Sequence, residues 1–247
     1  MAQPFTADPF GKYGDALNLR VLDNNTWEQI DFISRTEIVP RSMTAQQVAD
    51  EFGWNLGDTK EYATNLGFKY TARLIGILHD DLTAGGKAGM TFQPIEVTSL
   101  GQMQMGSSNS NGWNGTLLRS MSNYNIALAP DLKAVIKAVN KLTANNGSQA
   151  GAAIVASSDF LFQLSLMEIW GVSSPATLVG EGIQYAYWAV NNSSGDKIKL
   201  RNGIPSAYWT RSPSRVDTTS FIQILTDGNY GVLPAGSNSG VCLAFCV

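Results

Sequence analysis

The chain ends in a run of apolar residues that limits the ways in which it can fold. From Gly240 to Val247 the sequence reads GVCLAFCV, and no charged or hydrogen-bonding polar side chain interrupts the last seven positions. Such a segment is too apolar for an exposed tail and is typical of an inner strand with neighbours on both sides. We therefore expect this end of the chain to belong to the core, although chain termini are usually poorly ordered.

Two cysteines, Cys242 and Cys246, lie within this run. On a strand they would share a face about 13 Å apart, at ~3.3 Å per residue, which is too far for a disulfide bond. Because unpaired cysteine is among the most buried residue types, we expect two buried free thiols.

The composition indicates a folded globular protein, since 44% of the 247 residues are hydrophobic and only 15% are charged. The formal net charge of −3 and the lack of a basic stripe argue against nucleic acid as a partner. The first residues lack the basic and apolar regions of a signal peptide, and no window approaches the ~18 apolar residues of a membrane span. We expect a protein made in the cytoplasm, without membrane insertion.

Residues 1–53 are expected to form an appended unit, with an irregular arm, a β-hairpin and a short helix. The hairpin is predicted over residues 17–33, where apolar and polar residues alternate on both sides of a turn-forming DNNT segment. Thr44 as N-cap, Gln47 as its capping-box partner and Gly53 as the stop predict the helix. A lone hairpin is marginally stable, so we expect it to dock on its own domain or on another subunit.

The remainder, residues 54–247, is predicted to be one α+β domain with helices early and strands late. We expect a polar loop over 107–115 anchored by a buried Trp113, followed by a helix near Leu117. Helical spacing of apolar residues predicts a second helix over 130–142. Extended structure is expected over residues 68–78, 90–92, 160–171, 181–188 and 220–225.

His79, Asp80 and Asp81 follow one of these strands and form the first candidate site. Asp80 and Asp81 beside an imidazole could bind a divalent cation or act as acid and base. The alternative, which we favour, is that the two carboxylates cap the following turn, because their spacing matches no metal template. His79 is the only histidine, which excludes a zinc site or a catalytic triad that needs two imidazoles.

Glu168 and Glu181 form the second candidate site, since each lies in apolar surroundings. Two such carboxylates could hydrolyse a glycosidic bond. The alternative, again favoured, is that each is paired with an arginine in the interior, with Arg119 and Arg211 as the partners. We therefore predict no catalytic residues and no cofactor, with a divalent cation at Asp80 and Asp81 as the exception.

Several short blocks follow one another in order along residues 54–247. They are LIGILHDD at 74–81, KAGMTF at 87–92, Gly112-Trp113 with Leu118-Arg119, Ser158-Asp159 with EIWG at 168–171, EGIQY at 181–185, WTRS at 209–212 and the closing run. Together these blocks resemble an uncharacterised domain family of gut bacteria and their phages. That family is related in pattern to the C-type-lectin-like fold shared with formylglycine-generating enzymes. The oxidase activity of those enzymes is not expected here, because both cysteines stand in an apolar terminal strand.

The resemblance implies a C-type-lectin-like fold with a twisted antiparallel sheet, whose loops form a binding surface. It leads us to expect a non-enzymatic virion protein of a phage, used for capsid decoration or for receptor binding during host attachment. Residues 1–53 would contact other virion proteins, and the protein would be a homo-oligomer, for example a trimer. The alternative is a glycan-active enzyme or a bacterial surface carbohydrate-binding protein. A cell-surface glycan or protein would contact Trp113, Asn114, Tyr208, Trp209, Arg211 and Tyr230.

Overall fold

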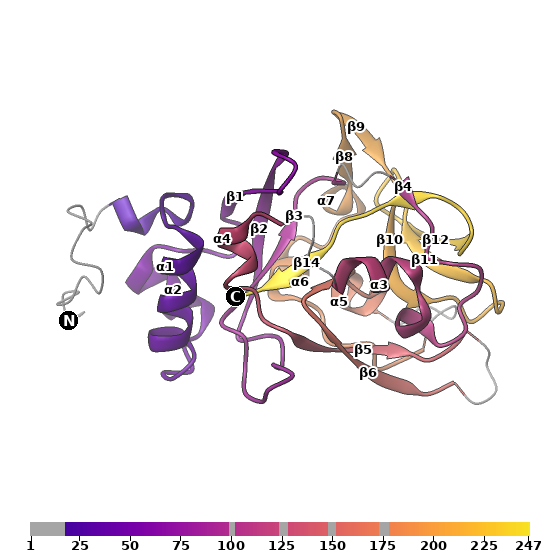
Figure 1. Ribbon diagram of the computed structural model, residues 1–247, viewed down its shortest axis with the longest axis horizontal. Helices are drawn as coiled ribbons and strands as arrows, with labels where there is room; N and C mark the ends of the chain where they lie inside the picture. Colours follow the sequence, from indigo (N-terminus) through magenta and orange to yellow (C-terminus); the bar gives the residue numbers. More distant parts are fainter. Residues whose placement is uncertain (1–17, 99–101, 124–127, 148–151, 173–177) are drawn as a thin grey trace.

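The computed structural model of the chain describes residues 18–98, 102–123, 128–147, 152–172 and 178–247. It is an α+β protein, as predicted, and its two larger sheets are mainly antiparallel (Figure 1). The helices α1 and α2 lie at one end of the molecule, and the second of the two sheets lies toward the other end. None of the helices in the described ranges is long and apolar enough to cross a membrane.

The first five-stranded sheet contains the C-terminal strand at an inner position, which confirms the prediction for this end of the chain. Phe245 pairs with Phe92 on one side and with Leu161 on the other. Residues 241–247 are all buried, and Cys242 and Cys246 are free thiols within the core. The strand order is β1 (Thr59–Ala63), β2 (Lys69–Ile77), β3 (Met90–Pro94), β14 (Ala244–Cys246) and β7 (Leu161–Phe162).

The second five-stranded sheet contains the predicted extended segment near residue 220 and the strand that follows it after a turn. Its order is β12 (Tyr230–Pro234), β11 (Ser220–Ile224), β10 (Tyr208–Pro213), β13 (Ser239–Gly240) and β4 (Gln102–Met103). Two ribbons complete the strands: β5 (Val139–Ala144) with β6 (Ile154–Asp159), and β8 (Lys199–Arg201) with β9 (Ile204–Ser206).

The predicted N-terminal hairpin is wrong, because the described part of this segment is helical. Two short 3-10 turns, η1 (Asn18–Arg20) and η2 (Leu22–Asn24), lead into α1 (Trp27–Ile33) and the π-helical turn η3 (Ser34–Ile38). Thr26 and Gln29 form a capping box at the start of α1. The capping box gives hydrogen-bond partners to backbone N–H groups that a hairpin would have paired across its strands. Trp27, Ile30 and Ile33 then recur at helical spacing and are buried.

The predicted helix over 44–53 is confirmed as α2 (Ala45–Phe52). Thr44 and Gln47 form the expected capping box, and Gly53 ends the helix with φ of 77°, a conformation that favours glycine. Trp27 of the neighbouring α1 packs edge-on against Phe92 and Phe245, with ring centroids 5.2 and 5.5 Å apart. The N-terminal helices and the first sheet therefore share one core.

The predicted helix over 130–142 is also wrong beyond its first turn. α4 covers only Pro130–Lys133, and the chain then extends into β5, which pairs with β6 along its full length. From Val139 the residues alternate between inward and outward positions, with Lys141 inward and Leu142 outward. The spacing of the apolar residues in this stretch fits both a helix and a strand. Pairing with β6, which lies further along the chain, favours the strand.

The remaining helices are short. The helix expected near Leu117 is confirmed as α3 (Leu117–Asn123), preceded by η4 (Gly112–Gly115), which holds the buried Trp113. The extended structure predicted over 160–171 is wrong for α5 (Leu166–Trp170), where Ser165 and Glu168 form another capping box. The extended structure predicted over 181–188 is likewise wrong for α6 (Ala186–Val190). A single turn, α7 (Ser194–Lys197), precedes β8.

Candidate functional site

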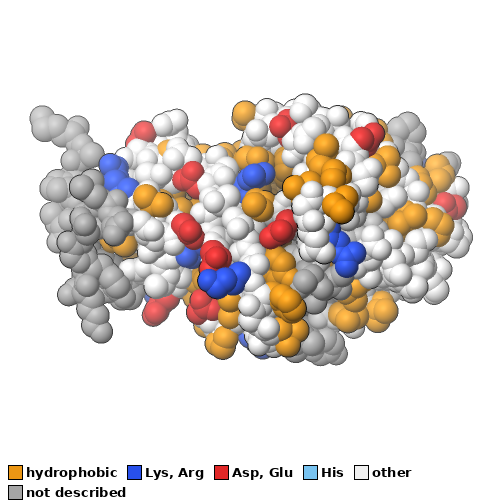
Figure 2. Space-filling model, turned by 90° about the horizontal axis from the view of Figure 1, so that it is seen from above, with side chains coloured by type: hydrophobic (Ala, Val, Ile, Leu, Met, Phe, Trp, Pro, Cys, Tyr) orange, Lys and Arg blue, Asp and Glu red, His pale blue; other side chains and the backbone are white. Residues whose placement is uncertain are grey.

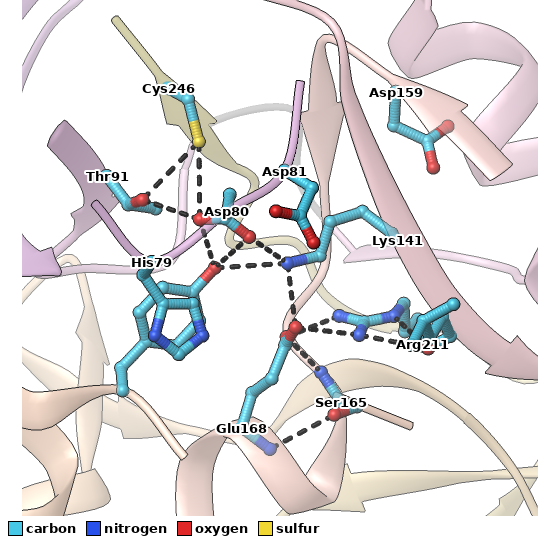
Figure 3. A network of polar contacts seen from close by, with 12 residues as sticks. His79, Asp80, Asp81, Thr91, Lys141, Asp159, Ser165, Glu168, Arg211 and Cys246 are labelled. Atoms are coloured by element: carbon cyan, nitrogen blue, oxygen red, sulfur yellow. Dashed lines mark hydrogen bonds and ion pairs between the residues drawn. The ribbon is translucent and has the colours of Figure 1, made fainter. Parts of the chain in front are cut away.

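Four charged side chains from distant parts of the chain meet inside the protein and form the main polar cluster, here called the ion network (Figure 3). Asp80 follows β2, Lys141 is on β5, Glu168 is on α5 and Arg211 is on β10. Their exposed fractions are 4, 2, 1 and 0%, respectively. Two carboxylates and two cations make the network neutral overall.

Lys141 and Arg211 both contact the carboxylate of Glu168. The Lys141 Nζ lies 2.6 Å from Asp80 Oδ1 and 2.7 Å from Glu168 Oε1, so it bridges the two acids. Arg211 donates from Nη2 to Glu168 Oε1 over 2.8 Å and from Nη1 to Glu168 Oε2. This two-pronged contact matches the planar guanidinium to the planar carboxylate.

Local structure holds each member of the ion network in place. Strand alternation points Lys141 inward, because its neighbours on β5 face outward. The capping box of α5 fixes Glu168, whose Oε2 accepts the N–H of Ser165 over 3.0 Å. After β2, Leu78 adopts a positive φ of 49°, and this left-handed residue precedes the turn that directs Asp80 into the core.

Asp80 accepts several further hydrogen bonds at the first sheet. Thr91 donates its hydroxyl to Asp80 Oδ2 over 2.6 Å, Tyr185 donates its phenol to the same oxygen over 2.9 Å, and the Cys246 thiol lies 3.4 Å away. Burial by itself would raise the pKa of Asp80, but the charges of Lys141 and His79 and the hydrogen bonds from Lys141 and Thr91 outweigh burial and hold the pKa below its usual value. Asp80 is therefore ionised inside the core.

The other three members of the ion network remain charged for the same reason. Burial opposes the charged form of each, yet the pKa of Lys141 is raised chiefly by Asp80 and Glu168. Arg211 and Lys141 lower the pKa of Glu168, and Glu168 raises the pKa of Arg211. Burying an ion pair requires partners for every charge, and here each charge has at least one.

Glu181 lies next to the ion network but outside its pairing. It is 1% exposed, and its Oε1 accepts the N–H of Ala144 over 2.9 Å. Burial raises its pKa to about 7, although Ser212, Ala144 and Arg211 act in the opposite direction. No ion pair joins Glu181 to a cation within the described ranges, because Arg211 is already paired with Glu168.

The predicted arginine partners of the two glutamates are therefore half right. Glu168 pairs with Arg211, as predicted for one of the two arginines, but the prediction is wrong for the other glutamate and the other arginine, because Arg119 contacts neither Glu168 nor Glu181 among the described ion pairs. Arg119 contacts Asp159 instead, with Nε 2.7 Å from Oδ1, and donates Nη2 to the Ser158 carbonyl over 3.1 Å. Nothing in the sequence around Arg119 indicates which acidic side chain it contacts.

The three consecutive residues His79, Asp80 and Asp81 point to different surroundings. Asp81 is exposed and pairs with the Lys87 ammonium at 2.7 Å across the turn. The prediction that both carboxylates cap this turn is wrong for Asp80, which is buried and binds Lys141 and Thr91 instead. His79 stacks on the ring of Tyr185 with centroids 3.9 Å apart, and burial lowers its pKa. Within the described residues, no group of three or more histidine, cysteine or acidic side chains is arranged to hold a metal ion.

The residues predicted to bind a ligand do not form one surface. Trp113, Tyr208, Trp209 and Arg211 are all buried. Their polar atoms bind the protein itself: Trp113 Nε1 donates to Asp159, Tyr208 donates its hydroxyl to the Lys197 carbonyl, and Trp209 Nε1 donates to the Met103 carbonyl. Only Asn114 and Tyr230 of the six are exposed.

A half-open apolar groove lies beside the β1–β2 hairpin. Its lining carries no charged side chain, and tyrosine and threonine hydroxyls are its polar groups. The lining residues are Tyr62, Thr64, Leu66, Phe68, Tyr70, Thr98, Leu128, Leu161, Leu243 and Phe245. None of the residues of the ion network opens into this groove.

Two residues of the site were missed by reasoning from the sequence, namely Lys141 and Tyr185. Lys141 was assigned to a helix, where an outward lysine is unremarkable. A charged residue at an inward position of an alternating strand would have marked it. Tyr185 brings its hydroxyl within 3.1 Å of Lys141 and 2.9 Å of Asp80, and no local pattern indicates this role.

The fold and site thus define an α+β domain built around a buried, neutral ion network. Residues 80–247 match the model of a family described as a domain of unknown function (DUF6273), and the chain belongs to that family. No curated protein and no solved structure matches the chain. The matched region begins at Asp80 and so includes the whole ion network, whereas β1, β2 and the N-terminal helices precede it.

Proposed function

We propose that the chain is a non-enzymatic structural protein of a phage virion, which decorates the capsid or binds a host receptor. In this proposal the family domain displays a lectin-like binding surface. The observation that supports a non-enzymatic role is that the candidate acids and bases of the ion network are buried and paired with one another. The virion assignment rests on the resemblance of the sequence to domains of gut bacteria and their phages.

A catalytic acid or base must come within hydrogen-bonding distance of its substrate. Asp80, Lys141, Glu168 and Arg211 are at most 4% exposed, so a substrate would have to open the core to reach them. The apolar groove carries no charged group that could transfer a proton at neutral pH. The ion network therefore supports the role of a rigid scaffold better than the role of an active site.

The N-terminal region is the proposed attachment point to other virion proteins. It precedes the family match, and its helices lie at one end of the molecule, while β10, β11 and β12 lie toward the other end (Figure 1). The exposed Asn114 and Tyr230 belong to the family domain. Attachment at the helical end would leave the family domain free for a host glycan or protein.

The face of the molecule shown in Figure 2 mixes acidic and basic groups with many uncharged ones, which favours protein or glycan contacts over nucleic acid.

The proposal is tested by supplying tagged protein during particle production and measuring its copies per purified particle by mass spectrometry. We expect the full-length chain in particles and at least a tenfold loss when residues 1–17, the first part of the proposed attachment region, are deleted. Ile204→Ser, an exposed position on β9, serves as the matched control and should be incorporated normally. Absence of the full-length chain from particles would reject the virion proposal.

A glycan-active enzyme is the second candidate, and one observation favours it. Glu181 has a pKa raised to about 7, which is the property of a general acid at neutral pH. Release of reducing sugar from host cell-surface polysaccharide, abolished in Glu181→Gln, would support this candidate and reject a non-enzymatic role. No release by either protein is the expected result.

A further inference from the structure

The strand β12 lies at the open edge of the second sheet. It pairs with β11 on one side over five residues, from Tyr230 with Ile224 to Pro234 with Ser220. On its other side, no strand of the described ranges pairs with it. Tyr230 and Val232 are 37 and 41% exposed, so the side chains at this edge are also accessible.

The other edges of the two five-stranded sheets are protected against pairing with another chain. β4 and β7 are only two residues long. β1 carries Lys60 and Glu61, and its outer groups are partly used: Asp23 accepts the Glu61 N–H over 2.8 Å, and the Ala63 carbonyl accepts the Ala129 N–H. Short strands, charged residues and covering segments are the usual protection of sheet edges. β12 has five residues, none of them charged.

The hydrogen-bond pattern shows which groups of β12 face outward. Leu225 donates its N–H to the Asn229 carbonyl, and Ala235 donates to the Thr219 carbonyl. In an antiparallel ladder the hydrogen-bonded pairs alternate, so Gly231 and Leu233 bond to β11. The N–H and C=O groups of Tyr230 and Val232 therefore point away from the sheet.

We propose that β12 pairs with β12 of a second copy of this chain, antiparallel and centred on Val232, which joins the two sheets across a two-fold axis. In this register Val232 faces Val232 of the second copy, and Tyr230 faces Pro234. The two Val232 residues exchange two N–H···O=C bonds. Each Tyr230 N–H donates to the opposite Pro234 carbonyl, whose other lone pair accepts the Ser237 N–H of its own chain. Pro234 has no N–H, so it falls where the ladder already ends.

A second copy is a suitable occupant because the strand is complementary to itself. In a two-fold interface residue i of one copy contacts residue j of the other and j contacts i, so only a residue on the axis meets its own counterpart, and a charge there would meet a like charge. None does here: in the same register, Asn229 faces Ala235 and Asp227 faces Ser237. The helices α1 and α2 lie far from β12 in Figure 1, so pairing leaves both N-terminal ends free. The result is a dimer, in place of the trimer named as an example from the sequence.

The register is tested by cysteine cross-linking in the full-length protein. Paired residues in a hydrogen-bonded antiparallel position lie about 5.5 Å apart between Cα atoms, within the range for a disulfide. Both native cysteines are buried, so an introduced surface cysteine is the reactive one. Under mild oxidation, Val232→Cys should give mostly cross-linked dimer, whereas Ile204→Cys, 69% exposed on β9, should stay mainly uncross-linked.

The solution mass measured by light scattering provides the second test. We expect the mass of two chains for the unaltered protein. Val232→Lys should have the mass of one chain, because the substitution places two like charges at the centre of the pair. Ile204→Lys should keep the dimer mass, and circular dichroism spectra should show that both variants are folded. A monomeric unaltered protein, a dimer that survives Val232→Lys, or equal cross-linking at both cysteine positions would overturn the proposal. None of these outcomes depends on whether the protein is found in virions.

Discussion

Lys141 shows how much of the core depends on one charged side chain. It bridges two acids that lie 88 residues apart in the sequence, Asp80 and Glu168, and it also contacts the Tyr185 hydroxyl. Removing it would leave two carboxylates buried beside each other with one remaining cation, Arg211. Breaking a buried ion pair from one side is usually far more costly than replacing the whole cluster by apolar residues.

We therefore predict that Lys141→Met destabilises the protein by about 3–5 kcal/mol in urea unfolding. Lys133→Met, at an exposed position on α4, is the matched control and should change the stability by less than about 0.5 kcal/mol. Equal unfolding midpoints for the two variants would show that Lys141 is not needed to compensate the buried carboxylates of the ion network.

Glu181 predicts a pH dependence of stability. Its pKa is raised from 4.5 to about 7 in the folded protein, so between these values the folded state holds a proton that the unfolded state has lost. Stability must then fall as the pH rises through this window and level off above it, by about 3 kcal/mol in total. Acids with lowered pKa values, such as Asp80, act at lower pH and with the opposite slope.

Glu181→Gln isolates this contribution, because the amide keeps the shape of the side chain and does not titrate. We expect the difference in unfolding free energy between the variant and the unaltered protein to grow in favour of the variant from pH 4.5 to 7. Chemical denaturation at several pH values measures it. A difference that does not vary with pH would mean that Glu181 has an ordinary pKa in the folded protein.

Among the elements, β14 has the largest structural role for its length. Its three residues lie between β3 and β7, and the residues around them fill the core. The Val247 carbonyl accepts the N–H groups of Gly89 and Met90, so even the last residue is part of the sheet. The apolar terminal run was sufficient to predict this inner position.

We predict that deleting residues 242–247 abolishes cooperative folding, because β3 and β7 lose the strand that joins them. Thermal unfolding followed by circular dichroism measures this. A matched internal control is Val232→Ser on the edge strand β12, which should melt cooperatively. A truncated protein that is soluble and melts cooperatively would contradict the inner position of the strand.

The errors at the scale of elements share one physical cause. Residues 27–33 and 139–144 contain apolar residues whose spacing fits more than one period. In the first, the capping box of Thr26 and Gln29 favours a helix. In residues 139–144, pairing with β6 favours a strand, and β6 is too far along the sequence for a short stretch of residues to reveal this pairing. Helix α2 was predictable because its cap, its apolar face and its stop all agree.

At the scale of the whole molecule, the N-terminal helices and the family domain share a core. Trp27 is buried against Phe92 and Phe245, and the Lys60 ammonium lies 5.2 Å from the Trp27 ring. The helices are therefore more than a detachable docking module, although they precede the family match.

We predict that Trp27→Ala destabilises the protein by about 3–5 kcal/mol, as expected for a large buried aromatic side chain. Val21→Ser, at an exposed position in the same N-terminal region, is the matched control and should leave the melting temperature nearly unchanged. Thermal melts and limited proteolysis of both variants measure the difference in stability between them. A Trp27→Ala protein as stable as the original would show that the helices do not support the sheet.

The sequence alone determined the α+β class, the buried C-terminal strand, the free thiols and the capped helix α2. Each of these depends on composition or on residues within a few positions of one another, where backbone hydrogen bonding and side-chain period act directly. Only the tertiary structure decided that Glu168 forms an ion pair with Arg211, while the Glu181 carboxylate forms none with an arginine of the described residues, and that Lys141 bridges two acids. Those choices join residues more than 25 positions apart, and the low dielectric of the core makes them depend on which charges the fold brings within contact.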